Sequence, residues 1–458
     1  MSTIAAISTA TGNGGIGIVR MSGKKSFEIL NKIFIPINKN DNEIKGYSMK
    51  FGYIVDPKTN EKIDEVLVSY FVGPKSYTTE NMCEINSHGG IIVEKRILQL
   101  CLENGADLSE PGEFTKRAFL GGRIDLAQAE SVIDLINSKS ENEAKASINQ
   151  LEGILSKKIR SIREKLLDVM SDIEANIDYP EYDIEEITNK KINEVLKDIK
   201  IDLTNLSKSF ESGKILKDGV KTIILGKPNA GKSSLLNSIL KEERAIVSEY
   251  AGTTRDTIEE FVNIRGIPLK LIDTAGIRKT EDKIEEIGVK RALKISEEAD
   301  LIIAIFDGSK ELDEEDLGIL NIIKNKKAIV ILNKKDIGDL HFENNESFIK
   351  DLNNNIIKIS AKTGEGIEDL ISIIEKMFKN DEIKMNDGII ITNIRHKNQI
   401  DKALTSVNEA IESSESGMPI DIVSIPIKQI LSDLSAITGE DVSEDIINEI
   451  FSKFCLGK

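Results

Sequence analysis

The first 120 residues alternate between short apolar runs and turn residues, which is the pattern of a mixed α/β domain. Turn chemistry such as Gly73-Pro74 separates some of the runs, and a helical pattern at 91–103 stands among them. The sequence therefore predicts an α/β domain over residues 1–120. The runs that predict its strands are residues 3–8, 15–21, 51–55 and 65–72.

The pattern becomes helical over residues 121–217, where glycine and proline are scarce. Apolar residues from Leu151 to Ile173 recur every three or four positions and predict one long helix with a single apolar seam. Tyr179-Pro180 is expected to interrupt this helix. The seam consists of Leu151, Leu155, Ile159, Ile162, Leu166, Val169 and Ile173.

Residues 218–379 alternate between strand and helix patterns, which is typical of a doubly wound α/β domain. The segment FVNIRGIPLKLID predicts a hairpin with Arg265-Gly266 at its turn. The apolar runs that predict parallel strands are residues 221–225, 269–272, 301–306, 328–332 and 356–359.

The chain becomes helical again over residues 380–458. Ser443 is expected to cap the last helix, with Glu444 and Asp445 at its positive end. Because helical segments flank the doubly wound segment, we expect that segment to be inserted into one helical domain; two separate helical domains are the alternative. One apolar face consists of Ile427, Ile430, Leu431, Leu434 and Ile437, and another of Ile446, Ile447, Ile450, Phe451 and Phe454.

The length of 458 residues is enough for about two to four domains. No apolar run approaches the roughly 20 residues of a membrane span, and the first residues lack the pattern of a signal peptide. Three cysteines without a C-x-x-C motif argue against a disulfide framework and a zinc site. We therefore expect a reduced, cytoplasmic environment.

The net charge of −16 argues against non-specific binding of nucleic acid, because phosphates would be repelled overall. The segment SKKIRSIREK at 156–165 is a candidate local basic patch, although a solvated helix face is the simpler interpretation. Gly12, Gly14 and Gly17 match the dinucleotide-binding pattern G-x-G-x-x-G. That fold needs a helix directly afterwards, whereas IGIVRMS predicts a strand, so we reject it.

A strand-like run ends in Gly226, and Gly231, Lys232 and Ser233 follow before a helical segment. This is G-x-x-x-x-G-K-S between a strand and a helix, the context that indicates a phosphate-binding loop. In such a loop, backbone N–H groups surround the phosphates, Lys232 reaches the β- and γ-phosphates, and Ser233 holds Mg²⁺.

Three further motifs follow strand ends, in the order expected of a GTPase. DTAG at 273–276 offers a carboxylate to a water on Mg²⁺ and the Gly276 N–H to the γ-phosphate. NKKD at 333–336 ends in Asp336, whose carboxylate accepts the N1–H and exocyclic amine of guanine but finds no such donors on adenine. A backbone N–H of SAK at 360–362 can meet the guanine oxygen. The sequence therefore predicts GTP as the nucleotide.

Hydrolysis lacks the groups that Ras-like proteins use. The residue after D-x-x-G is usually a glutamine that orients water, and Ile277 cannot do so. Glu285 is a candidate for this role, although its acidic neighbours also fit a solvated face. Thr253 or Thr254 of YAGTTRDT is expected to complete the Mg²⁺ shell when GTP orders that segment.

These motifs together resemble the MnmE (TrmE) family of bacterial tRNA-modification GTPases. The resemblance rests on the phosphate loop with Asn229 and on AGTTRD, DTAGIR and NKKD. It rests equally on GGIGIVRMSG, SYTTENMCEINSHGG, PGEFTKRAFLGGRIDLAQAE and the ending FCLGK. It runs from about residue 3 to Lys458, and it implies an N-terminal α/β folate-binding domain, a helical domain and an inserted Ras-like GTPase domain.

The resemblance implies a K⁺ ion that takes the place of an arginine finger. Asn229 would be one ligand, and oxygens of Ser248, Tyr250 and Thr253 would complete the site. The family commonly has threonine and isoleucine where this chain has Ser248 and Tyr250. The two GTPase domains of a homodimer would come together to form this K⁺ site in the active state.

The resemblance also assigns Ser233 and Thr254 as Mg²⁺ ligands and Glu285 as the residue that positions the attacking water. Arg278 is a switch residue in the same pattern, and it joins Glu285 and Lys232 as a candidate catalytic residue. The residues expected at GTP are Asn229, Ala230, Gly231, Lys232, Ser233, Ser234, Ser248, Thr253, Thr254, Asp273, Thr274, Ala275, Gly276, Asn333, Lys334, Asp336, Ser360, Ala361 and Lys362.

In the N-terminal domain, the resemblance implies a site for a tetrahydrofolate that carries a one-carbon unit, in its 5,10-methylene or 5-formyl form. Arg20, Glu84 and Arg123 fall on contact positions, and Lys458 contributes from the C-terminal end. Arg123 departs from a lysine seen in some members, which keeps the charge and changes the donor geometry.

Cys455 matches the cysteine of the family's C-x-G-K ending. It is a candidate catalytic nucleophile that activates the uracil ring, or a residue that packs near the folate; both interpretations stay open. A prenylation box is rejected because Gly457 is not aliphatic and Lys458 is an unusual terminal residue.

The resemblance implies a GTPase that works with the flavoprotein MnmG, in a heterotetramer, on carbon 5 of the wobble uridine of certain tRNAs. The product would carry a (carboxymethyl)aminomethyl group, and GTP hydrolysis would drive conformational cycling. A ribosome-assembly GTPase is the alternative, but residues 380–458 contain no RNA-binding module of the expected kind. A membrane-remodelling GTPase would carry an apolar or basic amphipathic insertion segment, and none is found.

Overall fold

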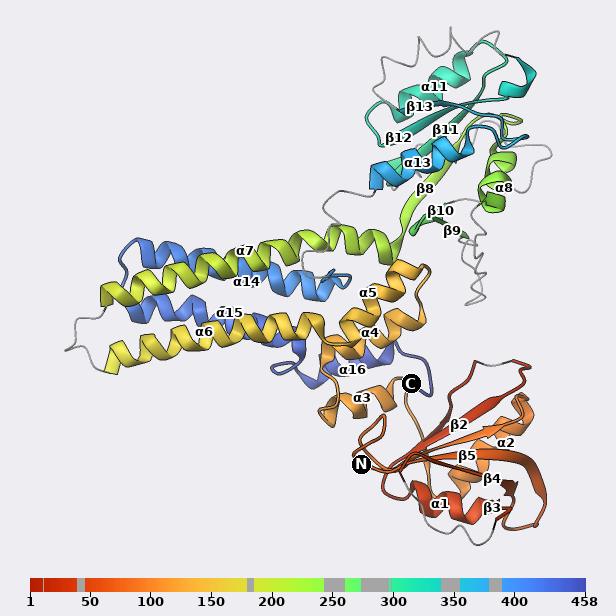
Figure 1. Ribbon diagram of the computed structural model, residues 1–458, viewed down its shortest axis with the longest axis vertical. Coiled ribbons are helices and arrows are strands. Elements are labelled where there is room, and N and C mark those ends of the chain that lie inside the picture. The colour runs from red at the N-terminus through yellow and green to blue at the C-terminus, as the bar shows by residue number, and fades with distance from the viewer. Residues whose placement is uncertain are drawn as a thin grey trace. The chain divides into compact units, whose positions relative to one another are not determined.

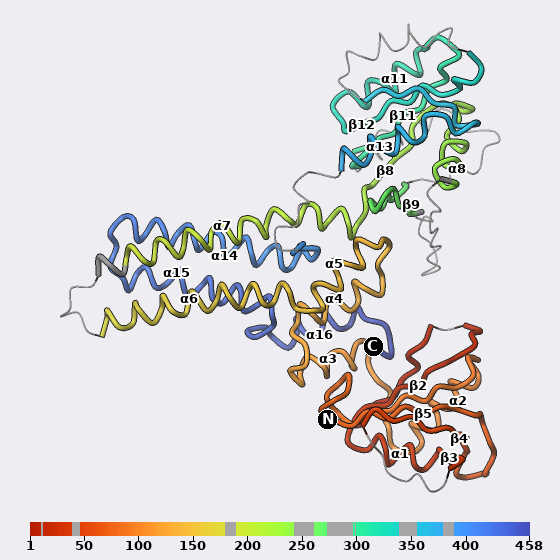
Figure 2. Tube along the Cα trace, viewed as in Figure 1, coloured from red at the N-terminus to blue at the C-terminus, as the bar shows by residue number. Residues whose placement is uncertain are grey.

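The computed structural model describes residues 1–10, 12–38, 46–178, 185–242, 260–272, 296–297, 299–338, 355–378 and 389–458 (Figures 1 and 2). The chain divides into two compact units, each made of separate stretches of sequence. The first unit comprises Met1–Ile133, Gln150–Ile192 and Glu412–Lys458, and the second comprises Asp134–Asn149 and Asn193–Ile411.

A seven-stranded sheet forms the N-terminal part of the first unit, in the order β3-β4-β5-β6-β2-β1-β7. Neighbouring strands are antiparallel, except that β1 and β7 are parallel to each other. The predicted strands are confirmed within a few residues, and the segment after the early glycines is the strand β2 rather than a helix. The strands are β1 Ile4–Ile7, β2 Gly17–Ser22, β3 Phe34–Pro36, β4 Ser48–Val55, β5 Lys62–Phe71, β6 Met82–Ser87 and β7 Asp107–Leu108.

Helices α1 (Ser26–Ile33) and α2 (Ile91–Glu103) cover one face of this sheet (Figure 1). Their apolar residues pack with those strand residues whose side chains point to the same side. Residues at the alternate positions, such as Arg20 and Leu67, point to the opposite face. The core on the helical side includes Val19, Leu30, Val68, Ile85, Ile97 and Leu100.

An exposed histidine at the end of β6 is held by one carboxylate. His88 Nδ1 lies 2.8 Å from Asp64 Oδ1, and the His88 backbone N–H donates to Asp64 Oδ2 at 2.8 Å. This hydrogen bond raises the pKa of His88 above its ordinary value of about 6.5. The protonated form therefore contributes stability that is fully present below about pH 6.5 and is lost as the pH rises through the folded-state pKa.

An NMR titration of the histidine ring protons tests this pair, because the chain contains three histidines. The His88 signal is expected to titrate above the unfolded-chain value, and Asp64→Asn is expected to lower that pKa. An unchanged His88 titration in the Asp64→Asn variant would contradict the assignment.

Within the described ranges, eight helices lie outside the two sheets and the helices that cover them. The predicted seam is continuous only from Leu155, because Leu151 ends α5 and Gly153 takes a φ of 78° before α6 begins. The prediction of one helix starting at Leu151 is therefore wrong. The helices are α3 Glu113–Leu120, α4 Leu126–Ile136, α5 Glu141–Leu151, α6 Ile154–Asp178, α7 Glu185–Asp218, α14 Ile394–Glu415, α15 Ile420–Thr438 and α16 Glu444–Ser452.

Helices from before and after the doubly wound segment pair with each other within both units. In the first unit α6 packs against α15, as the yellow and blue tubes of Figure 2 show. In the second unit, Ser207 Oγ on α7 donates to Asp401 Oδ1 on α14 at 2.8 Å. Helices that precede the doubly wound segment thus pair with helices that follow it, as the insertion of that segment into a helical part of the chain predicts. Tyr179-Pro180 lies outside the described residues.

The candidate basic patch lies on α6, where two of its arginines are in ion pairs. Arg160 lies 3.6 Å from Asp125, and Arg163 lies 2.6 Å from Glu440. The charge of these two residues is thus partly neutralised, as the interpretation of a solvated helix face expects. None of the helices within the described ranges is both long and apolar enough to span a bilayer.

The last helix begins where the sequence predicts, but two of its predicted side-chain interactions are not made. Ser443 is at the N-cap position of α16, but its side chain makes no capping hydrogen bond. Ile447 and Phe451 are buried, whereas Ile446 is 45% exposed and does not belong to the apolar face as predicted. The helix ends at Ser452.

A six-stranded sheet occupies the second unit, in the order β13-β12-β11-β8-β10-β9. All neighbouring strands are parallel except β9 and β10, which form the predicted hairpin. Helices α8 and α13 share one apolar cluster with the sheet and α11 shares another, as a doubly wound fold requires. The elements are β8 Val220–Leu225, α8 Lys232–Glu242, β9 Glu260–Ile264, β10 Ile267–Leu271, β11 Leu301–Asp307, α11 Glu314–Ile323, β12 Ala328–Asn333, β13 Asn355–Lys358 and α13 Ile367–Phe378.

Candidate functional site

The predicted phosphate loop connects β8 to α8 in the second unit. Asn229 has a φ of 62° and Gly231 a φ of 106°, so the backbone turns through the left-handed region twice within three residues. A Cβ atom at Gly231 would lie 2.1 Å from Asn333 Nδ2, which leaves room for glycine alone. Asn229, Ser233 and Ser234 are exposed, whereas Ala230 is buried.

The Lys232 side chain folds back into this loop. Its Nζ donates to the carbonyl oxygens of Gly226 at 2.6 Å and Lys227 at 2.7 Å. Burial lowers the pKa of the Lys232 ammonium, because desolvation disfavours the charged form. A phosphate bound in the loop would oppose that shift by bringing negative charge to the ammonium.

Asn333 joins the phosphate loop to the two predicted guanine motifs. Its side chain is 3% exposed; Nδ2 donates to the Ala230 carbonyl at 2.7 Å, and Oδ1 accepts from the Ala361 N–H at 2.9 Å. Asp336 Oδ1 accepts from Ser360 Oγ at 2.7 Å. Three segments that are far apart in the sequence thus meet at the carboxyl ends of parallel strands, where doubly wound sheets bind ligands.

Lys334 takes a left-handed φ of 70° directly after β12, and Lys362 is exposed beside Ala361. The structure therefore brings together every predicted nucleotide-site residue that it describes. The other predicted residues lie outside the described residues: Ser248, Tyr250, Thr253, Thr254, Asp273, Thr274, Ala275, Gly276, Arg278 and Glu285.

A second cluster lies in the first unit, on the sheet face that α1 and α2 leave open. Arg20 on β2 is directly opposite Glu84 on β6, and Arg20 Nε donates to Glu84 Oε1 at 2.8 Å. The two side chains are only 14% and 18% exposed. Arg20 Nη1 also donates to the Gly457 carbonyl at 3.0 Å, which brings the end of the chain to this pair.

Hydrogen bonds to their carbonyl oxygens hold residues 455–458 against the residue that follows β1 and against α3. The Gly457 carbonyl accepts from Ser8 Oγ at 3.0 Å, and the Lys458 carbonyl accepts from the Phe114 N–H at 3.2 Å. Burial and the neighbouring Arg20 charge lower the pKa of the Lys458 ammonium. Cys455 is exposed.

Tyr77 links Arg123 to this cluster, and the sequence alone did not single it out. The Arg123 guanidinium carbon lies 4.5 Å from the centroid of the Tyr77 ring, and that of Arg20 lies 5.6 Å away. The Tyr77 hydroxyl pairs with Thr115 Oγ1 at 2.9 Å. The sequence feature that could have indicated Tyr77 as a site residue is its position in a turn-rich segment beside charged motifs. The structure thus brings together the four predicted folate residues, Arg20, Glu84, Arg123 and Lys458.

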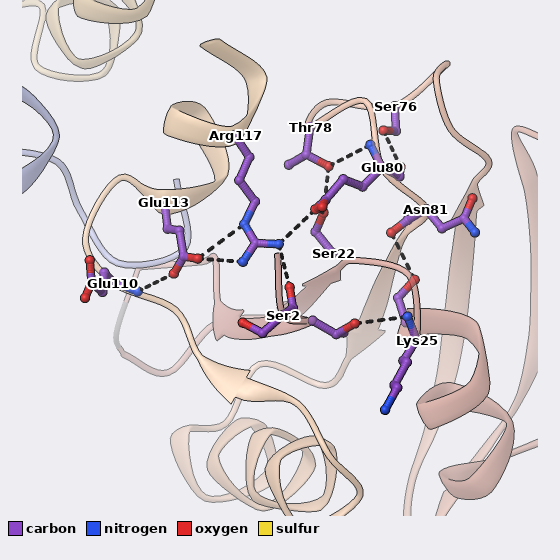
Figure 3. A network of polar contacts seen from close by, with 12 residues as sticks. Ser2, Ser22, Lys25, Ser76, Thr78, Glu80, Asn81, Glu110, Glu113 and Arg117 are labelled. Atoms are coloured by element: carbon purple, nitrogen blue, oxygen red, sulfur yellow. Dashed lines mark hydrogen bonds and ion pairs between the residues drawn. The ribbon is translucent and has the colours of Figure 1, made fainter. Parts of the chain in front are cut away.

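A buried arginine on α3 fixes the loop that carries Tyr77 (Figure 3). Arg117, which is 4% exposed, donates to Glu80 Oε2 at 2.9 Å and to the Ser2 carbonyl at 2.7 Å. Glu113 pairs with the same guanidinium at 2.6 Å. Ser22 in turn donates to Glu80 Oε2 at 2.9 Å. This network ties the loop, the first residues and α3 together, so it holds the walls of the cluster in place.

A phosphate loop after the first parallel strand, joined through a buried asparagine to an N-K-x-D motif, defines a P-loop GTPase of the Ras-like class.

Comparison with known proteins assigns the family. The family model described as the MnmE helical domain matches residues 126–455, and that of the GTP-binding protein TrmE N-terminus matches residues 3–123. A tRNA modification GTPase MnmE from Acetivibrio thermocellus is 51% identical and covers 100% of this chain and 99% of its own length. The protein of that name from Clostridioides difficile is 50% identical with the same coverage. The chain belongs to the MnmE (TrmE) family.

Proposed function

We propose that this chain is a GTPase that acts in tRNA modification, and that it works with the flavoprotein MnmG on carbon 5 of the wobble uridine of certain tRNAs. The observation that carries the GTPase assignment is the bridge that Asn333 makes between Ala230 and Ala361. The assignment to tRNA modification draws on relatives that bear that name over the full length of the chain. Such an activity belongs in the cytoplasm, where tRNA is modified.

At the nucleotide, Lys232 holds the β- and γ-phosphates with its ammonium, and the loop N–H groups surround them. Asp336 selects guanine while Ser360 fixes the orientation of its carboxylate. Mg²⁺ and K⁺ neutralise phosphate charge when bound. Of the described ligands, the Ser233 hydroxyl suits Mg²⁺ and the exposed Asn229 amide oxygen suits K⁺, because both cations prefer oxygen.

The remaining assignments at this site concern residues outside the described ranges. Thr254 would complete the Mg²⁺ shell, and oxygens of Ser248, Tyr250 and Thr253 would complete the K⁺ site. Glu285 positions the attacking water, and Arg278 acts in the same switch segment. GTP hydrolysis would then drive a conformational cycle rather than bond formation on tRNA.

In the first unit, the cluster around Arg20 binds a one-carbon tetrahydrofolate. The Glu84 carboxylate accepts N–H donors of the pterin ring, and Arg20, Arg123 and Lys458 supply positive charge for acidic groups of the ligand. Tyr77 offers an aromatic face beside the two arginines. Cys455 is close in sequence to Lys458, and its two candidate roles are as a nucleophile toward uracil and as a packing residue.

GTP turnover in K⁺ against Na⁺, at several protein concentrations, tests the hydrolytic part of this proposal. We expect activity that is specific for K⁺ and rises more than linearly with protein concentration, because the ion site needs two GTPase domains. Equal rates in both salts would remove Asn229 from its role in metal binding. A mass measurement of the wobble uridine, after incubation with MnmG, tRNA and a one-carbon folate, tests the modification itself.

The homodimer that this proposal requires has a suitable surface on the first unit. Phe51 on β4 and Leu67 on β5 are directly opposite each other on the open face of the sheet, and both are 44% exposed. Met49 on the same face is 60% exposed. This apolar row lies on the same face as Arg20 and Glu84, so a second copy seated on it would also border the folate cluster.

We expect the double variant Phe51→Lys and Leu67→Lys to be monomeric at concentrations where the unsubstituted chain is dimeric. Two charges placed at the centre of an apolar interface stay unpaired, which costs several kcal/mol of association free energy, roughly 3 or more. Light scattering after size exclusion measures the mass. Ile92→Lys, at a residue that is 77% exposed on the helix-covered side, is the matched control. A dimeric double variant would place the dimer interface elsewhere.

A further inference from the structure

The lysine of the guanine motif is held by a carboxylate that belongs to a different strand. Lys334 Nζ donates to Asp307 Oδ2 at 2.7 Å. Asp307 is the last residue of β11 and is directly opposite Asn333 in the parallel pair of β11 and β12. The side chain of Asp307 is 18% exposed and that of Lys334 is 27% exposed, so the ion pair is largely shielded from water.

Asp307 is itself fixed in position. Its Oδ1 accepts from the Ser309 hydroxyl at 2.6 Å and from the Ser309 N–H at 3.2 Å. The Gly308 N–H donates to the Asn333 carbonyl at 2.9 Å, which ties the start of this loop to the guanine motif. Burial alone would raise the pKa of Asp307, but hydrogen bonds from Lys334 and Ser309 outweigh it and lower the pKa.

The direction of the Lys334 side chain is therefore determined at both ends. The left-handed φ of 70° sets where the chain leaves the backbone, and Asp307 sets where the ammonium lies. Between these points is a stem of four methylene groups, which can lie flat on an aromatic ring. A lysine without such an anchor would lose rotamer freedom when a base binds against it, which weakens binding.

We propose that Asp307 is a positioning residue for guanine nucleotides, acting through Lys334. By holding the ammonium, it keeps the Lys334 stem extended over the plane of the guanine whose edge Asp336 reads. This inference rests on the proposed function as a GTPase and extends it to a residue outside the four motifs. The side chain of Asp307 contacts Lys334 and Ser309, so its effect on the base passes through Lys334.

A double-mutant cycle on nucleotide release tests the proposal. Asp307→Asn keeps the acceptor oxygen for Ser309 and removes the charge that holds Lys334. We expect it to speed the dissociation of a fluorescent GDP analogue about tenfold, the equivalent of one hydrogen bond to a charged group. In a Lys334→Met background, the same substitution is expected to have no further effect, because the group that it acts through is absent.

The matched control is Glu365→Gln, since Glu365 pairs at 2.5 Å with Lys335, the neighbouring lysine of the same motif. This variant is expected to release GDP at the unsubstituted rate. Equal acceleration by Asp307→Asn in both backgrounds would assign Asp307 to loop structure instead, and no acceleration in either would also overturn the proposal. If the unsubstituted chain binds no guanine nucleotide, the proposed function fails, and this inference fails with it.

Discussion

Replacing Asp336 by asparagine is expected to convert the nucleotide preference from GTP to XTP. In the unsubstituted chain, Ser360 Oγ donates to Asp336 Oδ1 at 2.7 Å. An asparagine at this position keeps Oδ1 for Ser360, so its amide nitrogen takes the place of Oδ2 and faces the base. Guanine presents N–H donors there, which repel an N–H group, whereas xanthine presents a carbonyl oxygen that accepts from it.

We expect kcat/KM for GTP to fall about 10³-fold or more, because a site built around a hydrogen bond strongly rejects a base that leaves its groups unpaired. The value for XTP is expected to rise above that for GTP. Asp336→Ala is the control, since it removes the hydrogen-bonding group and should lower turnover of both nucleotides. Retained GTP preference in the Asp336→Asn variant would show that Asp336 does not read the base.

The elements of the second unit could be predicted because each carries a strong local pattern. Its buried strands are apolar runs bounded by turn residues, and the hairpin was indicated by Arg265-Gly266 between two such runs. Both turn residues take positive φ values, 47° and 87°, which is the backbone geometry that two-residue hairpin turns commonly need. In contrast, β3 and β7 have three and two residues and could not be predicted, because pairing with β4 and β1 is what makes them strands.

The nucleotide motifs could be predicted for a similar reason, since their spacing within each loop is fixed by the phosphates and the base. Asp307 could not be predicted, because it ends a strand as many other aspartates do and meets Lys334 only across the sheet, 27 positions away. The interruption at Gly153 could not be predicted because the apolar spacing continues through this position. The helical backbone conformation does not, since Gly153 has a positive φ.

The cluster proposed to bind folate is the clearest case in which residue types alone were insufficient. Arg20 and Glu84 are ordinary charges in the sequence and become a nearly buried pair only because β2 lies beside β6. The contact from Arg20 to Gly457 spans 437 positions. No periodic pattern connects such distant residues, so the resemblance to a family supplied the grouping, and the sheet order supplies its physical basis.

Removing residues 456–458 is expected to weaken folate binding strongly and leave GTP hydrolysis unchanged. The Gly457 carbonyl holds both Arg20 Nη1 and Ser8 Oγ at 3.0 Å, so the deletion frees the guanidinium that pairs with Glu84. It also removes the ammonium of Lys458. The deletion thus removes the charge of Lys458 and the anchor that fixes Arg20. Together these losses are expected to weaken binding of 5-formyltetrahydrofolate at least about 100-fold.

Titration calorimetry with 5-formyltetrahydrofolate measures this effect, and GTP turnover of the same preparation shows that the second unit is intact. Lys458→Met separates the charge from the backbone anchor, and it is expected to lose less affinity than the deletion because Gly457 still holds Arg20. Lys453→Met, at a lysine paired with Glu449 on the exposed side of α16, is the matched control and should bind as the unsubstituted chain does. Full affinity in the deletion variant would mean that the Arg20 and Glu84 pair needs no support from the end of the chain.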